Sequence, residues 1–87
     1  MKIEKNAVAG TLESSDIYIS VEPAEALELE IDSVVKNQYY DEIERTLQEV
    51  LKEFEIESGK ISVKDRGALE CVIRARMETA IKRGGAC

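Results

Sequence analysis

The stretch AGTLESSD, residues 9–16, lies between two runs of strand-like sequence. The second run, residues 16–22, alternates apolar and polar side chains with the period of a half-buried strand. Ser14 and Ser15 are turn-forming residues, because their short polar side chains hydrogen-bond nearby backbone groups. The pattern predicts a β-hairpin that pairs residues 7–13 with residues 16–22 and carries both serines at its tip. A hydroxyl group at such a tip is exposed and accessible to another enzyme.

The rest of the sequence predicts a third strand, a long helix, a fourth strand and a second helix. Residues 27–32 alternate like a strand, and Pro23 separates them from the hairpin because proline cannot donate to a ladder. Residues 36–54 repeat apolar side chains at spacings of three and four, the pattern of an amphipathic helix. Residues 60–64 alternate again, and Asp65 is a candidate cap for the second helix. The apolar stripe of that helix comprises Leu69, Val72, Ile73, Met77, Ala80 and Ile81.

The predicted element order is β-β-β-α-β-α, which places the chain in the α+β class. The simplest packing is a two-layer sandwich, in which a four-stranded sheet carries two helices on one face. The strand at residues 27–32, the long helix and the strand at residues 60–64 can form a crossover unit, which makes that strand pair parallel. Because 87 residues is the length of one domain, we expect residues 1–87 to form a single domain.

The composition argues against several classes of function. A net charge of −6 disfavours nucleic acid as a partner, because phosphate binding needs a cationic surface. The chain has no His, no Gly-rich phosphate loop and no cluster of metal ligands, so we expect neither a metal site nor a catalytic residue. No apolar run approaches the length of a membrane span, and the first residues lack the apolar core of a signal peptide. The expected location is the cytoplasm, and the expected role is to carry a group rather than to transform it.

Two separated motifs resemble those of a known family. The segment AVAGTLESSD, residues 7–16, resembles the N-terminal signature of the citrate lyase acyl carrier protein, the gamma subunit of that complex. The segment DRGALECVIRAR, residues 65–76, resembles the same family, and a similar layout of strands and long helix lies between the two motifs. The resemblance spans residues 2 to about 83. The carrier subunit of malonate decarboxylase is a similar, more distant relative.

The resemblance implies a covalently attached prosthetic group. In the family, the serine directly after Leu-Glu is joined through a phosphodiester to 2'-(5''-phosphoribosyl)-3'-dephospho-CoA, and this serine corresponds to Ser14. Ser15 stands where the family often has glycine, and its hydroxyl makes it the second candidate. The thiol of the group is expected to carry acetyl and citryl thioesters while the complex cleaves citrate to oxaloacetate and acetate. The implied partners are the citrate lyase alpha and beta subunits, the prosthetic-group transferase and an acetylating ligase, with this chain as a non-catalytic carrier.

Two other functions stay open at this point, namely a carrier subunit for malonate decarboxylation and a non-catalytic adaptor domain without a prosthetic group. Cys71 is interpreted as a half-buried packing residue, because no His is available to activate its thiol. Cys87 is interpreted as an exposed terminal residue without an assigned role.

A group of basic residues on and before the second helix has two interpretations. It forms either a solvated face paired with Glu70 and Glu78, or a contact surface for the large subunits or for cofactor phosphates. The group comprises Arg66, Arg74, Arg76, Lys82 and Arg83.

Overall fold

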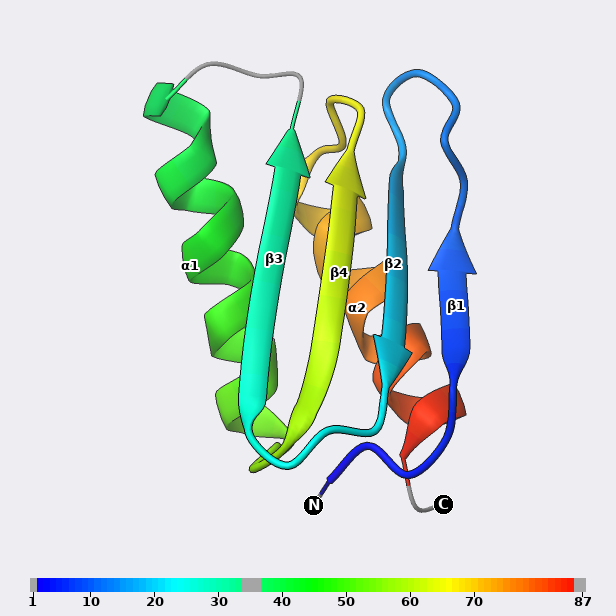
Figure 1. The fold of residues 1–87 in the computed structure, drawn as a ribbon. Coiled ribbons are helices and arrows are strands. Elements are labelled where there is room, and N and C mark those ends of the chain that lie inside the picture. Colours follow the sequence, from blue (N-terminus) through cyan, green and yellow to red (C-terminus); the bar gives the residue numbers. More distant parts are fainter. Residues whose placement is uncertain (1, 34–36, 86–87) are drawn as a thin grey trace.

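The computed structural model describes residues 2–33 and 37–85 of the chain. Its elements follow the predicted order β-β-β-α-β-α (Figure 1). They are β1 (Ala7–Gly10), β2 (Ile17–Glu22), β3 (Leu27–Ser33), α1 (Asn37–Glu53), β4 (Gly59–Asp65) and α2 (Glu70–Gly84). Among the described residues, no helix combines the length and the apolar character that crossing a lipid bilayer demands.

The four strands form one sheet with the spatial order β1-β2-β4-β3. β2 runs antiparallel to both of its neighbours, whereas β3 and β4 run parallel, as the crossover through α1 predicts. In this register Ile19 of β2 lies opposite Ala9 on one side and Val63 on the other. The alternation in the sequence is thereby converted into one apolar face of the sheet.

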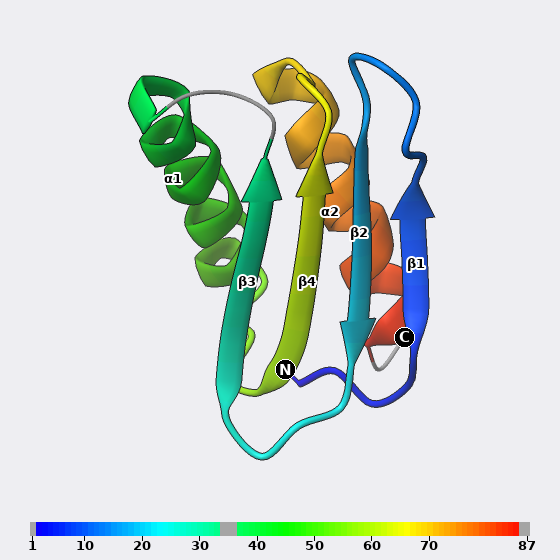
Figure 2. The same ribbon diagram turned by 45° about the horizontal axis from the view of Figure 1, so that its top comes forward.

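Both helices cover the same face of the sheet, which confirms the two-layer arrangement (Figures 1 and 2). The core lies between these layers, because the apolar side chains of the inner strands point toward the apolar stripes of the helices. Its side chains that are entirely screened from solvent include Ile17, Ile19, Leu47, Val50, Ile61, Met77 and Ile81. Burying an aliphatic side chain of this size contributes about 2 kcal/mol, so the sheet–helix interface is the main source of stability.

The start of the second helix differs from the sequence prediction. α2 begins at Glu70 after an N-cap at Leu69 that makes no side-chain hydrogen bond, and Asp65 is not the cap. Asp65 is still part of β4, where it lies between Ile17 of β2 and Ser33 of β3. Strands cover it on both sides, and it has no solvent-exposed surface. Its carboxylate instead accepts hydrogen bonds from the Ala68 amide at 3.0 Å and the Ser33 hydroxyl at 2.9 Å. The strand continues one residue further than the predicted end at residue 64, and Asp65 fixes the turn that leads into α2.

One end of the molecule gathers three connections. The β1–β2 loop, the segment from β4 to α2 and the beginning of α1 all lie at the same end of the sheet (Figures 1 and 2). The N-terminal segment lies at the opposite end, where Ile3 bridges to Gly85. The serine tip therefore lies at the end of the sheet opposite Ile3 and Gly85.

Candidate functional site

The predicted serine tip is an exposed turn between β1 and β2. Ser14 and Ser15 both lie in the turn with exposed side chains, and the Asp16 amide donates to the Glu13 carbonyl at 3.2 Å to close it. The first strand is shorter than predicted, because β1 ends at Gly10 and residues 11–13 belong to the loop. The tip is thus a loop of six residues, 11–16, rather than a tight two-residue turn.

The backbone conformation explains the end of β1 and distinguishes the two serines. Gly10 has φ +92°, and a Cβ atom there would lie 1.8 Å from the Ile17 carbonyl oxygen, so only glycine fits. Ser15 has φ 66°, a left-handed conformation that glycine adopts without strain. A glycine would suit this turn at position 15, whereas Ser14 is not among the residues with a positive φ.

Asp16 organises the loop. Its carboxylate accepts a hydrogen bond from the Thr11 hydroxyl at 2.7 Å and another from the Ile17 amide at 2.7 Å. It also forms a two-pronged ion pair with Arg76 of α2, from Nε to Oδ1 at 3.2 Å and from Nη2 to Oδ2 at 3.1 Å. The Asp16 side chain is 15% exposed, so this pair is partly shielded from water. One carboxylate therefore joins both ends of the loop to the helix beneath it.

These contacts shift the pKa of Asp16. The hydrogen bond from the Thr11 hydroxyl, followed by those from the Ile17 amide and the Arg76 guanidinium, lowers its pKa from 3.8 to about 2. All of these donors favour the ionised carboxylate. The loop is accordingly held together at any pH at which Asp16 is deprotonated.

A second set of contacts fixes the loop to the segment between β4 and α2. The Arg66 amide donates to the Asp16 carbonyl at 2.9 Å, and the Ser15 amide donates to the Arg66 carbonyl at 2.8 Å. These bonds extend the pairing of β2 with β4 beyond the ends of the two strands. The backbone on one side of the serine tip is thus ordered, while the Ser14 hydroxyl stays exposed.

The basic residues of the second helix divide into distinct roles. Arg74 donates to Glu53 of α1 at 2.6 Å and to Glu49 at 3.3 Å, so its recorded partners lie on the other helix rather than at Glu70 and Glu78 as predicted. The two helices pack side by side, which brings these α1 carboxylates within reach. Arg76 is assigned to the serine loop through Asp16. Within the described structure, Arg74 and Arg76 therefore bind different elements, one α1 and the other the β1–β2 loop.

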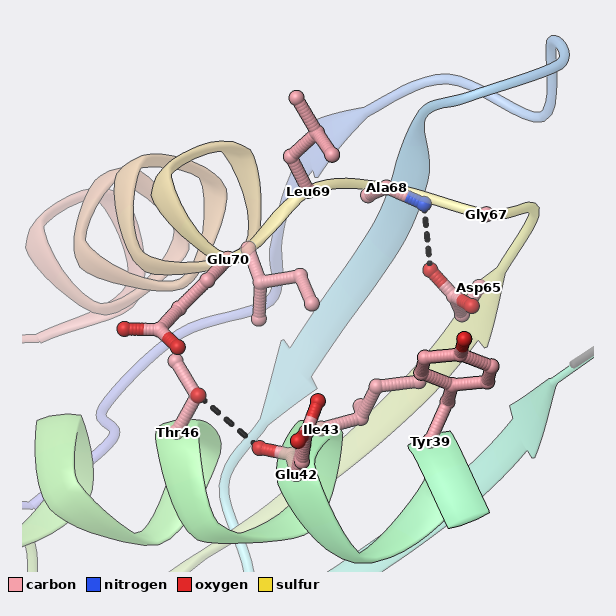
Figure 3. A pocket seen from close by; sticks show the side chains of 10 residues that line it. Tyr39, Glu42, Ile43, Thr46, Asp65, Gly67, Ala68, Leu69 and Glu70 are labelled. Carbon is pink, nitrogen blue, oxygen red and sulfur yellow. Dashed lines mark hydrogen bonds between the residues drawn. The ribbon is translucent and has the colours of Figure 1, made fainter. Parts of the chain in front are cut away.

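A pocket lies at the same end of the molecule, between the first turns of α1 and the segment that leads into α2 (Figure 3). Its volume is about 240 Å³. Tyr39 and Ile43 line it from α1, and Ala68, Leu69 and Ile73 line it from the other side. Sequence reasoning placed Leu69 in the buried stripe of the helix, but this side chain is 71% exposed. Leu69 is the N-cap residue, with an extended backbone rather than a helical one, so it does not continue the apolar stripe of α2.

Cys71 is not among the residues that line the pocket or form the serine loop. Cys71 is a free thiol and is exposed, which corrects its interpretation as a half-buried packing residue. Its neighbours Val72 and Ile73 face the core, which leaves Cys71 on the outer side of α2. Cys87 lies outside the described residues. Across residues 2–33 and 37–85, no three His, Cys, Asp or Glu side chains gather in a way that could hold a metal ion.

Local sequence patterns do not single out Thr11 and Arg76 as members of the site. Asp16 and Arg76 are 60 positions apart, and no periodicity links residues at that separation. A signal was nevertheless present, because Asp16 closes the first family-like motif and Arg76 closes the second. The two motifs meet in space through the ion pair between their last residues.

Comparisons with known proteins agree with this picture. Residues 4–84 match the family model described as malonate decarboxylase delta subunit (MdcD). A citrate lyase acyl carrier protein from Treponema denticola is 47% identical over 83 residues, covering 95% of this chain and 95% of that protein. A protein of the same name from Haemophilus influenzae strain PittEE is 49% identical, covering 95% of this chain and 87% of that protein.

A likeness in fold accompanies these matches. The structure resembles a chain in the crystal structure of a Pseudomonas malonate decarboxylase hetero-tetramer in complex with malonate, with a TM-score of 0.83 and 21% identity. The alignment covers 94% of this chain and 86% of that chain. At this level of identity the likeness concerns the fold, while the family follows from the closer sequences. With nearly half of its residues identical over 95% of its length, the chain belongs to the family of citrate lyase acyl carrier proteins.

Proposed function

We propose that this chain, as one carrier domain spanning residues 1–87, is the acyl carrier subunit of a citrate lyase in the cytoplasm, and that Ser14 bears the prosthetic group. The group proposed is 2'-(5''-phosphoribosyl)-3'-dephospho-CoA, joined to Ser14 through a phosphodiester. When attached, it supplies a thiol that carries acyl groups as thioesters. The observation that supports this most directly is the exposed Ser14 hydroxyl on a loop that Asp16 and Arg76 hold in place.

The residues present suit such a group. An anchor for a long arm needs an unhindered hydroxyl that a transferase can reach, and the Ser14 side chain is exposed at the end of the sheet. The loop backbone must also keep its conformation when a large group is attached, and the hydrogen bonds of Ser15 and Asp16 hold it in place. In the attachment step the Ser14 oxygen bonds to the phosphorus of a phosphoanhydride donor, the P–O bond to the donor's phosphate leaving group breaks, and the Ser14 proton passes to a base of the transferase.

The chain itself performs no other chemistry in this proposal. It has no His to act as a general base near the serine, so the transferase must supply the catalytic groups for attachment. The proposed partners are the citrate lyase alpha and beta subunits, that transferase and an acetylating ligase. A tethered arm raises the effective concentration of its thiol at the active sites of these proteins.

A second candidate function is the carrier subunit of malonate decarboxylase. Two observations favour it, namely the family model that residues 4–84 match and the fold of the Pseudomonas hetero-tetramer chain. The 47% and 49% identities to citrate lyase carriers favour the first function. Co-purification of the tagged chain with citrate lyase subunits, rather than with decarboxylase subunits, would decide between the two.

Intact mass spectrometry after co-expression with the transferase tests the attachment. The wild-type chain is expected to gain the mass of the prosthetic group, Ser14→Ala to gain nothing, and Ser15→Ala to gain the full mass. Removing a surface hydroxyl changes stability by no more than about 0.5 kcal/mol, so Ser14→Ala should remain folded. A mass gain on Ser14→Ala together with its loss on Ser15→Ala would move the anchor to Ser15. A wild-type chain that stays unmodified would favour the adaptor domain.

A further inference from the structure

The pocket between α1 and α2 is connected to the serine tip by a short run of backbone. The Arg66 carbonyl accepts a hydrogen bond from the Ser15 amide at 2.8 Å. Directly after Arg66, Gly67 and Ala68 form one wall of the pocket, and Figure 3 shows this segment passing above the side chains that rise from α1. The attachment loop and the pocket therefore share one structural support at one end of the molecule.

The lining of the pocket suits a weakly polar occupant. Much of the wall consists of apolar groups from Ile43, Ala68 and Ile73, and the side chains of Tyr39 and Leu69 are 52% and 71% exposed around it. The buried polar groups in the wall already have partners inside the protein. The Thr46 hydroxyl donates to the Glu42 carbonyl at 2.9 Å, and the Asp65 carboxylate accepts from the Ala68 amide. An occupant would gain mainly from removing apolar surface from water.

The size of the pocket limits what can enter. Sites for drug-sized molecules measure about 300–1,000 Å³, whereas this one measures about 240 Å³. It has room for the end of a linear arm with a small acyl group, but not for a nucleotide as well. Because the arm would be tethered to the same chain, even a weak interaction would give substantial occupancy.

The charges at the pocket add selectivity. Glu42 on α1 and Glu70 at the start of α2 line it from opposite sides, and both side chains are exposed. Carboxylate groups at these positions repel an acyl group that itself carries carboxylates, but not a neutral one. The recorded ion pairs of the described residues include no basic partner for either glutamate.

We propose that this pocket holds the pantetheine end of the carrier's own prosthetic arm when its thiol bears a short neutral acyl group, and that it rejects acyl groups with free carboxylates. The proposal rests on the attachment at Ser14 proposed above. In this arrangement the pocket shelters the thioester from water between visits to the partner subunits. An acyl group with carboxylates stays outside, where a partner can take it up.

The first test measures hydrolysis of the acetyl thioester on the isolated carrier. The protein is loaded by the transferase, its mass gain is confirmed, and the loss of the acetyl group is then followed by intact mass at mildly alkaline pH. Ala68→Leu fills the pocket and should make hydrolysis several-fold faster than in the wild type. Ala75→Leu makes the same change at an exposed position of α2 outside the pocket and should leave the rate unchanged. Equal rates in all three proteins, with Ala68→Leu folded by circular dichroism, would overturn the proposal.

A second measurement needs no substitution, so a misfolded variant cannot obscure the result. NMR spectra of the acetylated carrier and of the unmodified chain are compared at the methyl groups of Ile43 and Ile73 and at the Ala68 amide, with Ile19 of the core as a reference. Shifts at the pocket groups but not at Ile19 are expected. Shifts confined to residues 11–16 would show that the arm stays in solvent or on another surface, and would overturn the proposal.

The charge selectivity has its own test. Protection is measured for each acyl group as its hydrolysis rate in Ala68→Leu divided by its rate in the protein tested, because a succinyl carboxylate speeds loss of its own thioester in any protein. The succinyl thioester should show no protection in the wild type, and the double substitution of Glu42→Gln with Glu70→Gln should give it protection like that of the acetyl form. If the succinyl and acetyl forms are equally protected in the wild type, the proposed role of the two glutamates is wrong. If the transferase adds no mass to Ser14, the proposed function is wrong, and the proposed role of the pocket is wrong as well because no arm is present to enter it.

Discussion

Two loops of the same sheet are both exposed but are held in different ways. The β1–β2 loop, residues 11–16, is tied by Asp16 to Thr11 and Arg76 and by its backbone to Arg66. The β2–β3 connection lies at the opposite end of β2, and within the described part of the chain its residues 23–25 make no recorded hydrogen bond or ion pair. Loops of similar exposure therefore differ in the polar contacts that hold them.

The contrast shows how a loop can be held in place and still expose a side chain. A loop that is ordered by burial hides its side chains, whereas a loop that is ordered by polar contacts can leave one hydroxyl in solvent. In residues 11–16 no side chain is fully buried, and the order comes from a carboxylate and from an extension of the strand pairing. The four predictions below test this contrast, from the largest expected effect to the smallest.

Replacing Gly10 by alanine should have the largest effect. The new Cβ atom would meet the Ile17 carbonyl oxygen at 1.8 Å, so the backbone at the start of the loop has to move. We expect a loss of about 3 kcal/mol in the free energy of unfolding, measured by urea denaturation. Gly67→Ala is the matched control, because Gly67 also has a positive φ of +94° but no heavy atom within 4 Å of its added Cβ. It should lose only about 1 kcal/mol from backbone strain, and equal losses would contradict the clash at Gly10.

Protonation of Asp16 should release the polar tether. Its folded-state pKa of about 2 lies below the ordinary value of 3.8, so the stabilisation is complete above pH 4 and disappears as the pH falls through 2. The difference in urea midpoint between wild type and Asp16→Asn should therefore be clear at pH 5 and shrink steadily as the pH falls toward 2. Amide exchange at Ser15 should be several-fold faster in Asp16→Asn at pH 5. Glu13→Gln removes another carboxylate from the same loop and should change neither measurement.

Features that depend on local sequence were predicted, whereas features that depend on contacts between distant residues were not. The strand alternation of residues 16–22 and the helical period of residues 36–54 are local, and they predicted the order of the elements and the two layers correctly. The first strand is the exception, because it ends at Gly10 and leaves a longer loop around the serines than predicted. The ion pair between Asp16 and Arg76 depends on how α2 lies under the hairpin, which no local pattern contains. Asp65 illustrates the same limit, since a residue typical of helix caps is drawn into the sheet by its register with neighbouring strands.

Glycine substitutions at the two adjacent serines should change the free energy of unfolding in opposite directions. Ser15→Gly removes the strain of a left-handed residue, which outweighs the extra freedom of glycine in the unfolded chain, so it should stabilise the protein by about 0.5 kcal/mol. Ser14 is not among the residues with positive φ, and Ser14→Gly should destabilise the protein by about 0.5–1 kcal/mol. Urea denaturation of the two variants measures both effects. Destabilisation of similar size in both would show that the turn does not favour glycine at position 15.

The smallest effect is expected at the other loop. Inserting Gly-Ser between Ala24 and Glu25 lengthens a connection whose central residues make no recorded polar contacts in the described structure. Loop-closure entropy alone predicts a loss of about 0.4 kcal/mol for this change. The same insertion between Leu12 and Glu13 separates Thr11 from Asp16 and should cost clearly more, because the hydroxyl–carboxylate contact at 2.7 Å is lost with it. Urea midpoints that fall equally for both insertions would mean that the polar contacts of residues 11–16 add nothing to the order of the loop. A larger fall of the urea midpoint for the insertion at the serine tip would show that polar contacts stabilise this exposed loop. The same two added residues would then be tolerated at one end of β2 and not at the other.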